Sequence, residues 1–293
     1  MPGIDAHCHF WQIARGDYGW LNEAGPKLDC LRRDFLPPEL SDINQRCPVV
    51  AVQAAPTEAE TRYLLALASE HQQIAAVVGW FDLADPQATD RLAQLAANPL
   101  LKSLRPMLQD IPEDDWINRA PVPALLDRMA TLGLRLDALV LPRHLEPLNR
   151  FVQRYPDLPV IIDHAAKPAL ATPPGDPRHA MWSQGMAQLA AFDHVHCKLS
   201  GLLTEMHPDQ LADPHSALTV LRPVVDALLD WFGPQRLVWG SDWPVLTLAA
   251  SHQRWVELSD KLLADLSTDE RAAIFGGNAQ RFYGLSTNPE AQK

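Results

Sequence analysis

The sequence predicts an α/β protein whose strands close into a (β/α)8 barrel, the TIM-barrel architecture. Short, apolar, strand-like segments alternate with helical segments along the 293 residues, and eight such strands fit in this length. No glycine-rich phosphate loop follows any of the strands, which argues against the main alternative, a doubly wound nucleotide-binding sheet. Hydrophobic residues make up 47% of the chain, which is enough for a large core.

The expected strands and helices alternate from one end of the chain to the other. Runs of β-branched and other apolar residues predict strands at 4–11, 49–55, 75–81, 101–105, 134–141, 159–164 and 195–199, and an eighth beginning at 237. Apolar residues at helical spacing predict helices at 57–72, 87–97, 121–132, 145–155, 218–232, 249–263 and 269–275. We expect one domain over residues 1–286 and a flexible tail at 287–293. A loop-rich insertion at 12–46 is long for a connection, so we expect it to be a lid or part of a site.

Charge and composition exclude several classes of partner. The formal net charge is -11 and no run of Lys or Arg occurs, so nucleic acid and anionic membranes have little to bind. The first residues lack a basic segment followed by an apolar core, and no apolar stretch is long enough to span a bilayer. Four scattered cysteines predict neither a disulfide framework nor a thiolate zinc site. We expect a soluble, cytoplasmic protein that binds a small molecule, with its oligomeric state left open.

Histidine and aspartate residues stand at the ends of three predicted strands. His7 and His9 alternate with apolar residues in the first strand, so both side chains point to one face. His164 ends the sixth strand, and Asp242 follows the eighth. The carboxyl ends of parallel barrel strands meet at one face, where active sites form. Three imidazoles and a carboxylate at that face predict a divalent metal site with nitrogen and oxygen ligands.

Strand parity predicts which further polar residues face the barrel interior. Gln53 shares a face with small residues of the second strand, and Arg105 shares a face of the fourth strand with Ser103. Lys198 alternates with apolar residues in the seventh strand. We expect Gln53, Arg105 and Lys198 to line a pocket beside the histidines. Asp163, of the opposite parity to the histidine that follows it, is expected to brace the barrel.

These motifs resemble those of the amidohydrolase superfamily. Longer strings resemble its sugar-lactonase branch, which includes L-fuconolactonases and L-rhamnonolactonases. The strings are IDAHCHFW, RGDYGWL, LPRHL, IIDHAAKP, CKLSGL, FGPQRLVWGSDWPV and IFGGNAQRFYGL. The resemblance covers nearly the whole chain, and it implies a hydrolase that opens an aldonolactone to the aldonic acid in carbohydrate catabolism.

The resemblance also implies a metal site. His7, His9 and His164 match the family's metal-ligand positions, and Asp242 matches the position that binds metal and transfers protons. The fourth strand lacks a suitably placed bridging lysine, and the fifth strand contains no histidine. The resemblance therefore implies at most one divalent ion, which we expect to be zinc, and part of the branch works with none.

Lactone hydrolysis assigns expected roles to the polar residues. Asp242 would take a proton from the attacking water and pass it to the departing ring oxygen. Charged donors would hold the oxyanion or the new carboxylate. The candidates for catalysis are Asp242, His164, Arg105 and Lys198. The candidates for substrate binding are Gln53, Lys167, Trp243 and His144.

Structural roles and other functions compete with this interpretation. A buried histidine on a strand is usually a satisfied core group, and Lys198 and Arg105 could form a structural ion pair. A metal-dependent decarboxylase on the same barrel is the nearest enzymatic alternative. A non-catalytic sugar-binding barrel is a third possibility, but such a protein would not need the full set of three histidines and an aspartate.

Overall fold

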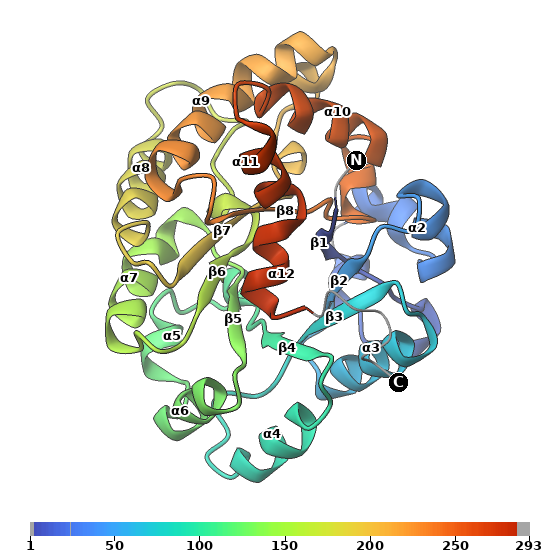
Figure 1. Ribbon diagram of the computed structural model, residues 1–293, viewed down its shortest axis with the longest axis vertical. Coiled ribbons are helices and arrows are strands. Elements are labelled where there is room, and N and C mark those ends of the chain that lie inside the picture. The colour runs from blue at the N-terminus through green and yellow to red at the C-terminus, as the bar shows by residue number, and fades with distance from the viewer. Residues whose placement is uncertain (1–2, 24, 286–293) are drawn as a thin grey trace.

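The computed structural model describes residues 3–23 and 25–285, and its eight strands form one parallel sheet in the order β1 to β8 (Figure 1). The strands are β1 (Asp5–Cys8), β2 (Val49–Val52), β3 (Ile74–Gly79), β4 (Leu101–Leu104), β5 (Arg135–Ala138), β6 (Val160–Ile162), β7 (Val195–Leu199) and β8 (Leu237–Trp239). The predicted (β/α)8 barrel is confirmed. Several strands end earlier than predicted. The tail predicted at 287–293 lies outside the described residues.

Two backbone hydrogen bonds join the last strand to the first and close the barrel. The N–H of Asp242 donates to the carbonyl oxygen of His7 at 2.7 Å. The N–H of His9 donates to the carbonyl oxygen of Trp243, also at 2.7 Å, and Cys8 and Trp243 form a parallel bridge. Because Asp242 lies just past β8, closure of the barrel brings it beside the His-x-His motif of β1.

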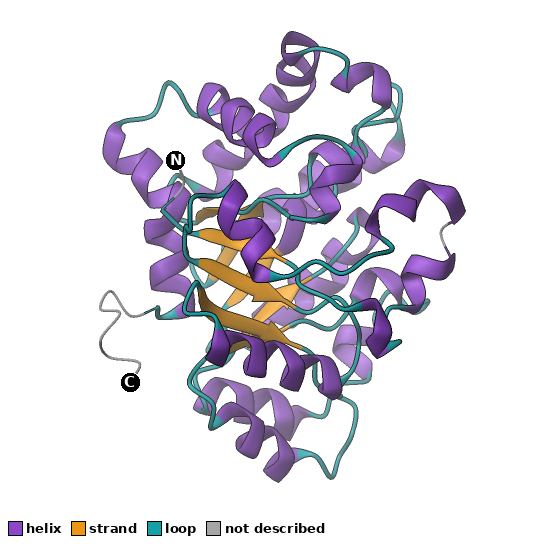
Figure 2. Ribbon diagram, turned by 90° about the vertical axis from the view of Figure 1, so that its right-hand side faces the viewer, coloured by secondary structure: helices purple, strands orange, loops and turns teal. Residues whose placement is uncertain are grey.

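Helices surround the strands (Figure 2). They are α1 (Gly19–Glu23), α2 (Pro37–Ile43), α3 (Glu58–Glu70), α4 (Thr89–Ala96), α5 (Trp116–Arg119), α6 (Pro123–Thr131), α7 (Leu145–Arg154), α8 (Pro177–Leu189), α9 (Pro214–Phe232), α10 (His252–Leu262), α11 (Thr268–Ala272) and α12 (Asn278–Tyr283). No helix within the described ranges is both long and apolar enough to cross a membrane.

Helix α8 was not predicted from the sequence. Its buried apolar residues include Trp182, Met186 and Leu189, which recur at helical spacing, but a glycine and several polar residues lie among them. The side chain of Asp176 caps its first turn by accepting a hydrogen bond from the backbone N–H of Arg178 at 2.9 Å. The helix therefore depends on its cap and on its tertiary packing.

The insertion at 12–46 contains several short helices joined by loops. Tyr18 of this segment donates a hydrogen bond of 2.8 Å to the buried carboxylate of Glu60 on α3. The indole of Trp20 donates to the carbonyl oxygen of Ala54 at 2.9 Å. These two bonds hold the insertion against the carboxyl end of β2.

Apolar side chains form two separate layers. The larger layer fills the space between strands and helices, and the smaller layer fills the barrel interior and includes Val50 and Val52 of β2. Phe282 and Tyr283 of α12 pack into this inner layer from the amino-terminal ends of the strands, where α12 crosses the barrel (Figure 1). The inward face of β2 thus belongs to its valines at 50 and 52, and Gln53 has the other parity.

Candidate active site

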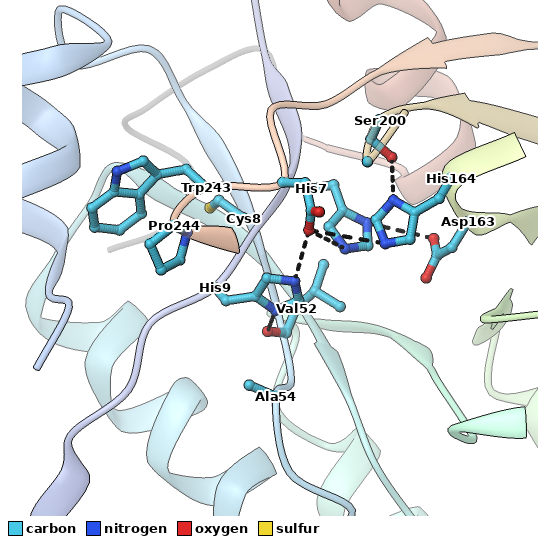
Figure 3. Close-up of polar contacts among 12 residues, drawn as sticks. His7, Cys8, His9, Val52, Ala54, Asp163, His164, Ser200, Trp243 and Pro244 are labelled. Atoms are coloured by element: carbon cyan, nitrogen blue, oxygen red, sulfur yellow. Dashed lines mark hydrogen bonds and ion pairs between the residues drawn. The ribbon is translucent and has the colours of Figure 1, made fainter. Parts of the chain in front are cut away.

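Strand β1 places two buried histidines at the end of the barrel where the strands have their carboxyl ends. His7 is 0% exposed and His9 is 4% exposed. The Nδ1 atom of His9 lies 2.8 Å from the carbonyl oxygen of Val52, so Nδ1 donates its proton there and Nε2 is left with a lone pair. The Nε2 atom of His7 has no hydrogen-bond partner among the described residues. Figure 3 shows both rings turned toward the same space.

His164 reaches this space from a strained turn. Residues 164–167, which follow β6, all have positive φ, between 49° and 57°. Residues other than glycine rarely adopt this left-handed conformation, and such strain clusters at functional sites. The Nδ1 atom of His164 lies 2.9 Å from Oγ of Ser200, which fixes the ring (Figure 3). Gly201, with φ of 62°, leaves the necessary room, because a Cβ at this position would lie 2.4 Å from that Nδ1.

One carboxylate oxygen of Asp242 lies close to all three imidazoles. Its Oδ1 lies 3.3 Å from Nε2 of His9, 3.7 Å from Nε2 of His7 and 3.9 Å from Nε2 of His164. Asp242 is 3% exposed and has a φ of 63°. Burial opposes its charge, but the three imidazoles, His164 foremost, hold its pKa below the ordinary value. The structure thus brings together four side chains separated by more than two hundred positions in the sequence.

A buried ion network lies beside the histidines. Lys198 is 0% exposed, and its Nζ donates to Asp137 at 2.5 Å and lies 2.9 Å from Oδ1 of Asp163. The same Nζ is 3.1 Å from Nδ1 of His7, and the hydroxyl of Tyr283 donates to Asp137 at 2.8 Å. Burial opposes the charge of Lys198, but the two carboxylates raise its pKa. The expected role of Lys198 in holding an oxyanion is therefore corrected, because its ammonium group is enclosed by protein partners.

A pocket of about 280 Å³ opens over the cluster. The residues from the sequence prediction that line it are His9, Arg105, His164, Lys167 and Asp242. The Nη1 atom of Arg105 is 3.3 Å from Asp163, while its Nε has no hydrogen-bond partner among the described residues. Lys167 is partly exposed and lies 3.7 Å from Glu205. The pocket therefore combines imidazoles, two cationic side chains and the carboxylates of Asp242 and Asp110.

Three residues expected to bind substrate lie outside this pocket. Gln53 is fully buried and donates to the carbonyl oxygen of Arg105 at 2.9 Å, because the parity of β2 is the reverse of the expected one. Trp243 is 1% exposed and packs among aromatic rings of the core. His144 accepts a hydrogen bond at 3.0 Å from the backbone N–H three positions earlier and so stabilises the turn before α7. None of the three side chains is placed to contact a ligand in the pocket.

Sequence reasoning missed the aromatic wall and part of the ion network. Trp11 and Trp20 line the pocket, and Trp20 comes from the insertion, which therefore contributes to the site. Its string RGDYGWL was noted for its resemblance, but its contacts could not be assigned. Asp137 was overlooked although it is the one acidic residue of β5 between two apolar neighbours, a pattern that indicates an inward-facing charge.

The donor atoms fit a single divalent cation. One ligand atom from each of His7, His9 and Asp242 lies within 4.8 Å of the others. Burial lowers the pKa of His7 well below its ordinary value and that of His164 to about 4, so both rings are neutral near pH 7 and keep a lone pair. His164 lies outside the compact group of three. Two imidazoles and a carboxylate form a ligand set that zinc accepts, and the unpartnered Nε2 of His7 is the atom that such an ion would satisfy.

Fold and site together define a barrel hydrolase of the amidohydrolase type. The sequence profile of the amidohydrolase family matches residues 4–285, and the chain belongs to this family. It is 45% identical to L-fucono-1,5-lactonase from Burkholderia ambifaria, over 96% of this chain and 95% of that protein. It is 38% identical to L-fucono-1,5-lactonase from Burkholderia multivorans, over 99% of this chain and 98% of that protein.

A solved structure agrees with this membership. The crystal structure of an amidohydrolase from Burkholderia multivorans with bound zinc matches with a TM-score of 0.85 and 38% identity, covering 97% of this chain and 99% of that one. The protein is therefore an enzyme of the hydrolase class, and the curated relatives described above are lactonases.

Proposed function

We propose that this enzyme hydrolyses the ester bond of an aldonolactone to give the aldonic acid, and that L-fucono-1,5-lactone is a substrate. The two Burkholderia relatives, both named L-fucono-1,5-lactonase, support this choice of substrate. The observation that carries the proposal is the convergence of three Nε2 atoms on Oδ1 of Asp242 at the base of a pocket that also holds Arg105 and Lys167. This arrangement places a proton acceptor beside positive charge, as opening an ester requires.

Asp242 is the proposed proton carrier. Its lowered pKa keeps the carboxylate ionised at neutral pH, so it can accept a proton from a water molecule while the water oxygen attacks the lactone carbonyl carbon. The bond between that carbon and the ring oxygen then breaks, and Asp242 returns the proton to the departing alkoxide. One water is consumed, and the carboxylic acid and the hydroxyl of the open chain are formed.

Arg105 and Lys167 are proposed to stabilise negative charge. Both line the pocket, and Nε of Arg105 is a donor that no described residue uses. A guanidinium or ammonium group directed at the carbonyl oxygen would stabilise the tetrahedral oxyanion and then the product carboxylate. His164 lines the same pocket, held by Ser200, and we assign it the orientation of the carbonyl group.

His7, His9 and Asp242 are the residues that would hold one divalent ion, and we propose zinc. Bound there, such an ion would act as a Lewis acid and would lower the pKa of a nearby water molecule. Protein groups near Nδ1 of each ring fix the orientation of the two imidazoles. The carbonyl of Val52 orients His9, and Oδ1 of Asp163, 3.5 Å from Nδ1 of His7, can accept the proton of that ring and leave Nε2 free for the ion.

Acid release from a panel of aldonolactones tests the function. In lightly buffered medium with a pH indicator, L-fucono-1,5-lactone should release protons well above its uncatalysed rate, and lactones of other stereochemistry should do so more slowly. No release above the uncatalysed rate from any lactone would discard the proposal. Release of CO2 from aromatic or sugar acids would instead indicate the decarboxylase, and calorimetric lactone binding without turnover would indicate a non-catalytic sugar-binding barrel.

A further inference from the structure

A second cavity adjoins the catalytic pocket at the same end of the barrel. Its volume is about 700 Å³, against about 280 Å³ for the catalytic pocket. Its walls come from the insertion, from the segments that follow β2, β3 and β4, and from α5. Trp20, Met107 and Asp110 line both spaces, so the two spaces meet at these residues. The smaller pocket lies just below the range for small-molecule sites, about 300–1,000 Å³, whereas the cavity is well within it.

Aromatic rings cover much of the cavity wall. Trp20, Trp80, Phe81 and Trp116 all line it. Trp80 and Trp116 are half-buried, and their indole N–H groups make no hydrogen bond with any described residue. An indole offers a flat apolar face and one polar edge. These rings can therefore pack against the C–H face of a sugar while their free N–H groups donate to its hydroxyls.

The charges on the wall select against anions. The carboxylates of Asp17, Asp82 and Asp110 line the cavity, whereas none of the described residues on its wall is a Lys, Arg or His. Asp110 makes no side-chain hydrogen bond or ion pair with a described residue. Carboxylates accept hydrogen bonds from hydroxyl groups and repel other anions. The cavity thus suits an uncharged polyhydroxylated group, while the carboxylate product belongs with the cations of the catalytic pocket.

We propose that this cavity binds an uncharged glycosyl group attached to the lactone ring, so that the enzyme opens disaccharide lactones as well as simple aldonolactones. The inference rests on the proposed lactonase function, because it places the ring to be opened beside Asp242. The attached sugar extends past Trp20 and Met107 into the cavity. Asp110, with no partner among the described residues, and the carboxylate of Asp82 accept hydrogen bonds from its hydroxyl groups, and Trp80 and Trp116 enclose its ring.

Kinetics on a set of disaccharide lactones tests this proposal. Lactones made from neutral reducing disaccharides of several linkages are compared with the monosaccharide lactone. The parent enzyme should hydrolyse at least one disaccharide lactone with a kcat/KM within about tenfold of the simple lactone. Trp116→Ala should lower kcat/KM for that disaccharide lactone by about tenfold or more and should leave the monosaccharide lactone nearly unchanged. Trp231→Ala, a half-buried tryptophan on α9 that packs against Trp182, is the matched control and should change neither value.

Two results would overturn the proposal while the lactonase function stands. One is hydrolysis of monosaccharide lactones with none of any disaccharide lactone, and the other is an equal effect of Trp116→Ala on both substrates. If no lactone of either kind is hydrolysed, the function itself fails, and binding still tests the cavity. Titration with the neutral disaccharide should then change tryptophan fluorescence in the parent but not in Trp116→Ala. The absence of any such change would exclude the second sugar site.

Discussion

The backbone N–H of Asp242 donates a 2.7 Å hydrogen bond to the carbonyl oxygen of His7. This bond belongs to the closure of the barrel, and it also fixes the distance between the carboxylate and two imidazoles. Gly240 makes the approach possible, because a Cβ there would lie 2.6 Å from Cβ of His7. Closing the sheet and assembling the site are therefore one structural event, so disturbances at this seam should affect stability and activity together.

Gly201→Ala should lower kcat by about 100-fold, because the added Cβ would lie 2.4 Å from Nδ1 of His164 and would displace the ring. Kinetics on L-fucono-1,5-lactone checks this. Gly133→Ala is the matched control, since Gly133 also has a positive φ of 69° but nothing lies within 4 Å of the position of its Cβ. Equal kcat values for the two variants would contradict the positioning of His164 by Gly201.

Lys198→Met should lower the free energy of unfolding by about 3–5 kcal/mol, because Asp137 and Asp163 would lose their buried counter-charge. A double-mutant cycle with Asp137→Asn, followed by denaturant unfolding, measures the coupling. The double variant should be more stable than the sum of the single losses predicts, by about 1–3 kcal/mol. Strict additivity would show that the ammonium and the carboxylate do not depend on each other.

Stability should fall as pH rises through the titration of Glu60. Burial raises the pKa of Glu60 from its ordinary value of 4.5 to about 7, so between these values the folded protein holds a proton that the unfolded chain has released. The stabilising contribution is complete below about pH 4.5 and is lost by about pH 7. Between pH 5 and pH 8 the loss should be about 2–3 kcal/mol.

The variant Glu60→Gln removes this titration and checks its sign. Relative to the parent, it should gain free energy of unfolding between pH 5 and pH 8. The control Glu146→Gln changes a side chain that is 69% exposed, and its difference from the parent should stay constant over the same range. A constant difference for Glu60→Gln as well would mean that the carboxylate buried under Tyr18 does not titrate as described.

Substitutions of the three histidines should differ in their effect on zinc affinity. His7→Asn and His9→Asn should each weaken binding by about 10–100-fold or more, since both residues belong to the compact donor group. His164→Asn should bind zinc nearly as the parent does, yet lose activity, because its ring lies outside that group. Calorimetric titration of chelator-treated protein with zinc measures the affinities. Loss of zinc binding in His164→Asn would make His164 a ligand and not an orienting group.

Much of the site could be predicted from local patterns. The alternation in β1 predicts that His7 and His9 share a face, and the end of β8 predicts the place of Asp242. The prediction for Gln53 failed because its face of β2, shared with Val49 and Ala51, packs under the helices, while Val50 and Val52 fill the barrel interior; both faces consist of small apolar residues, so the sequence does not show which one is inside. The enclosure of Lys198 likewise depends on partners from β5 and β6 that are distant in the sequence.

The most direct test of the account compares Asp242→Asn with the parent in hydrolysis of L-fucono-1,5-lactone. Asparagine keeps the size and shape of the side chain but cannot carry the proton. We predict that kcat falls by about 1,000-fold while the variant keeps its folded structure. A folded Asp242→Asn that hydrolyses the lactone at the parent's rate would contradict the central claim that this carboxylate, among its three imidazoles, performs the reaction.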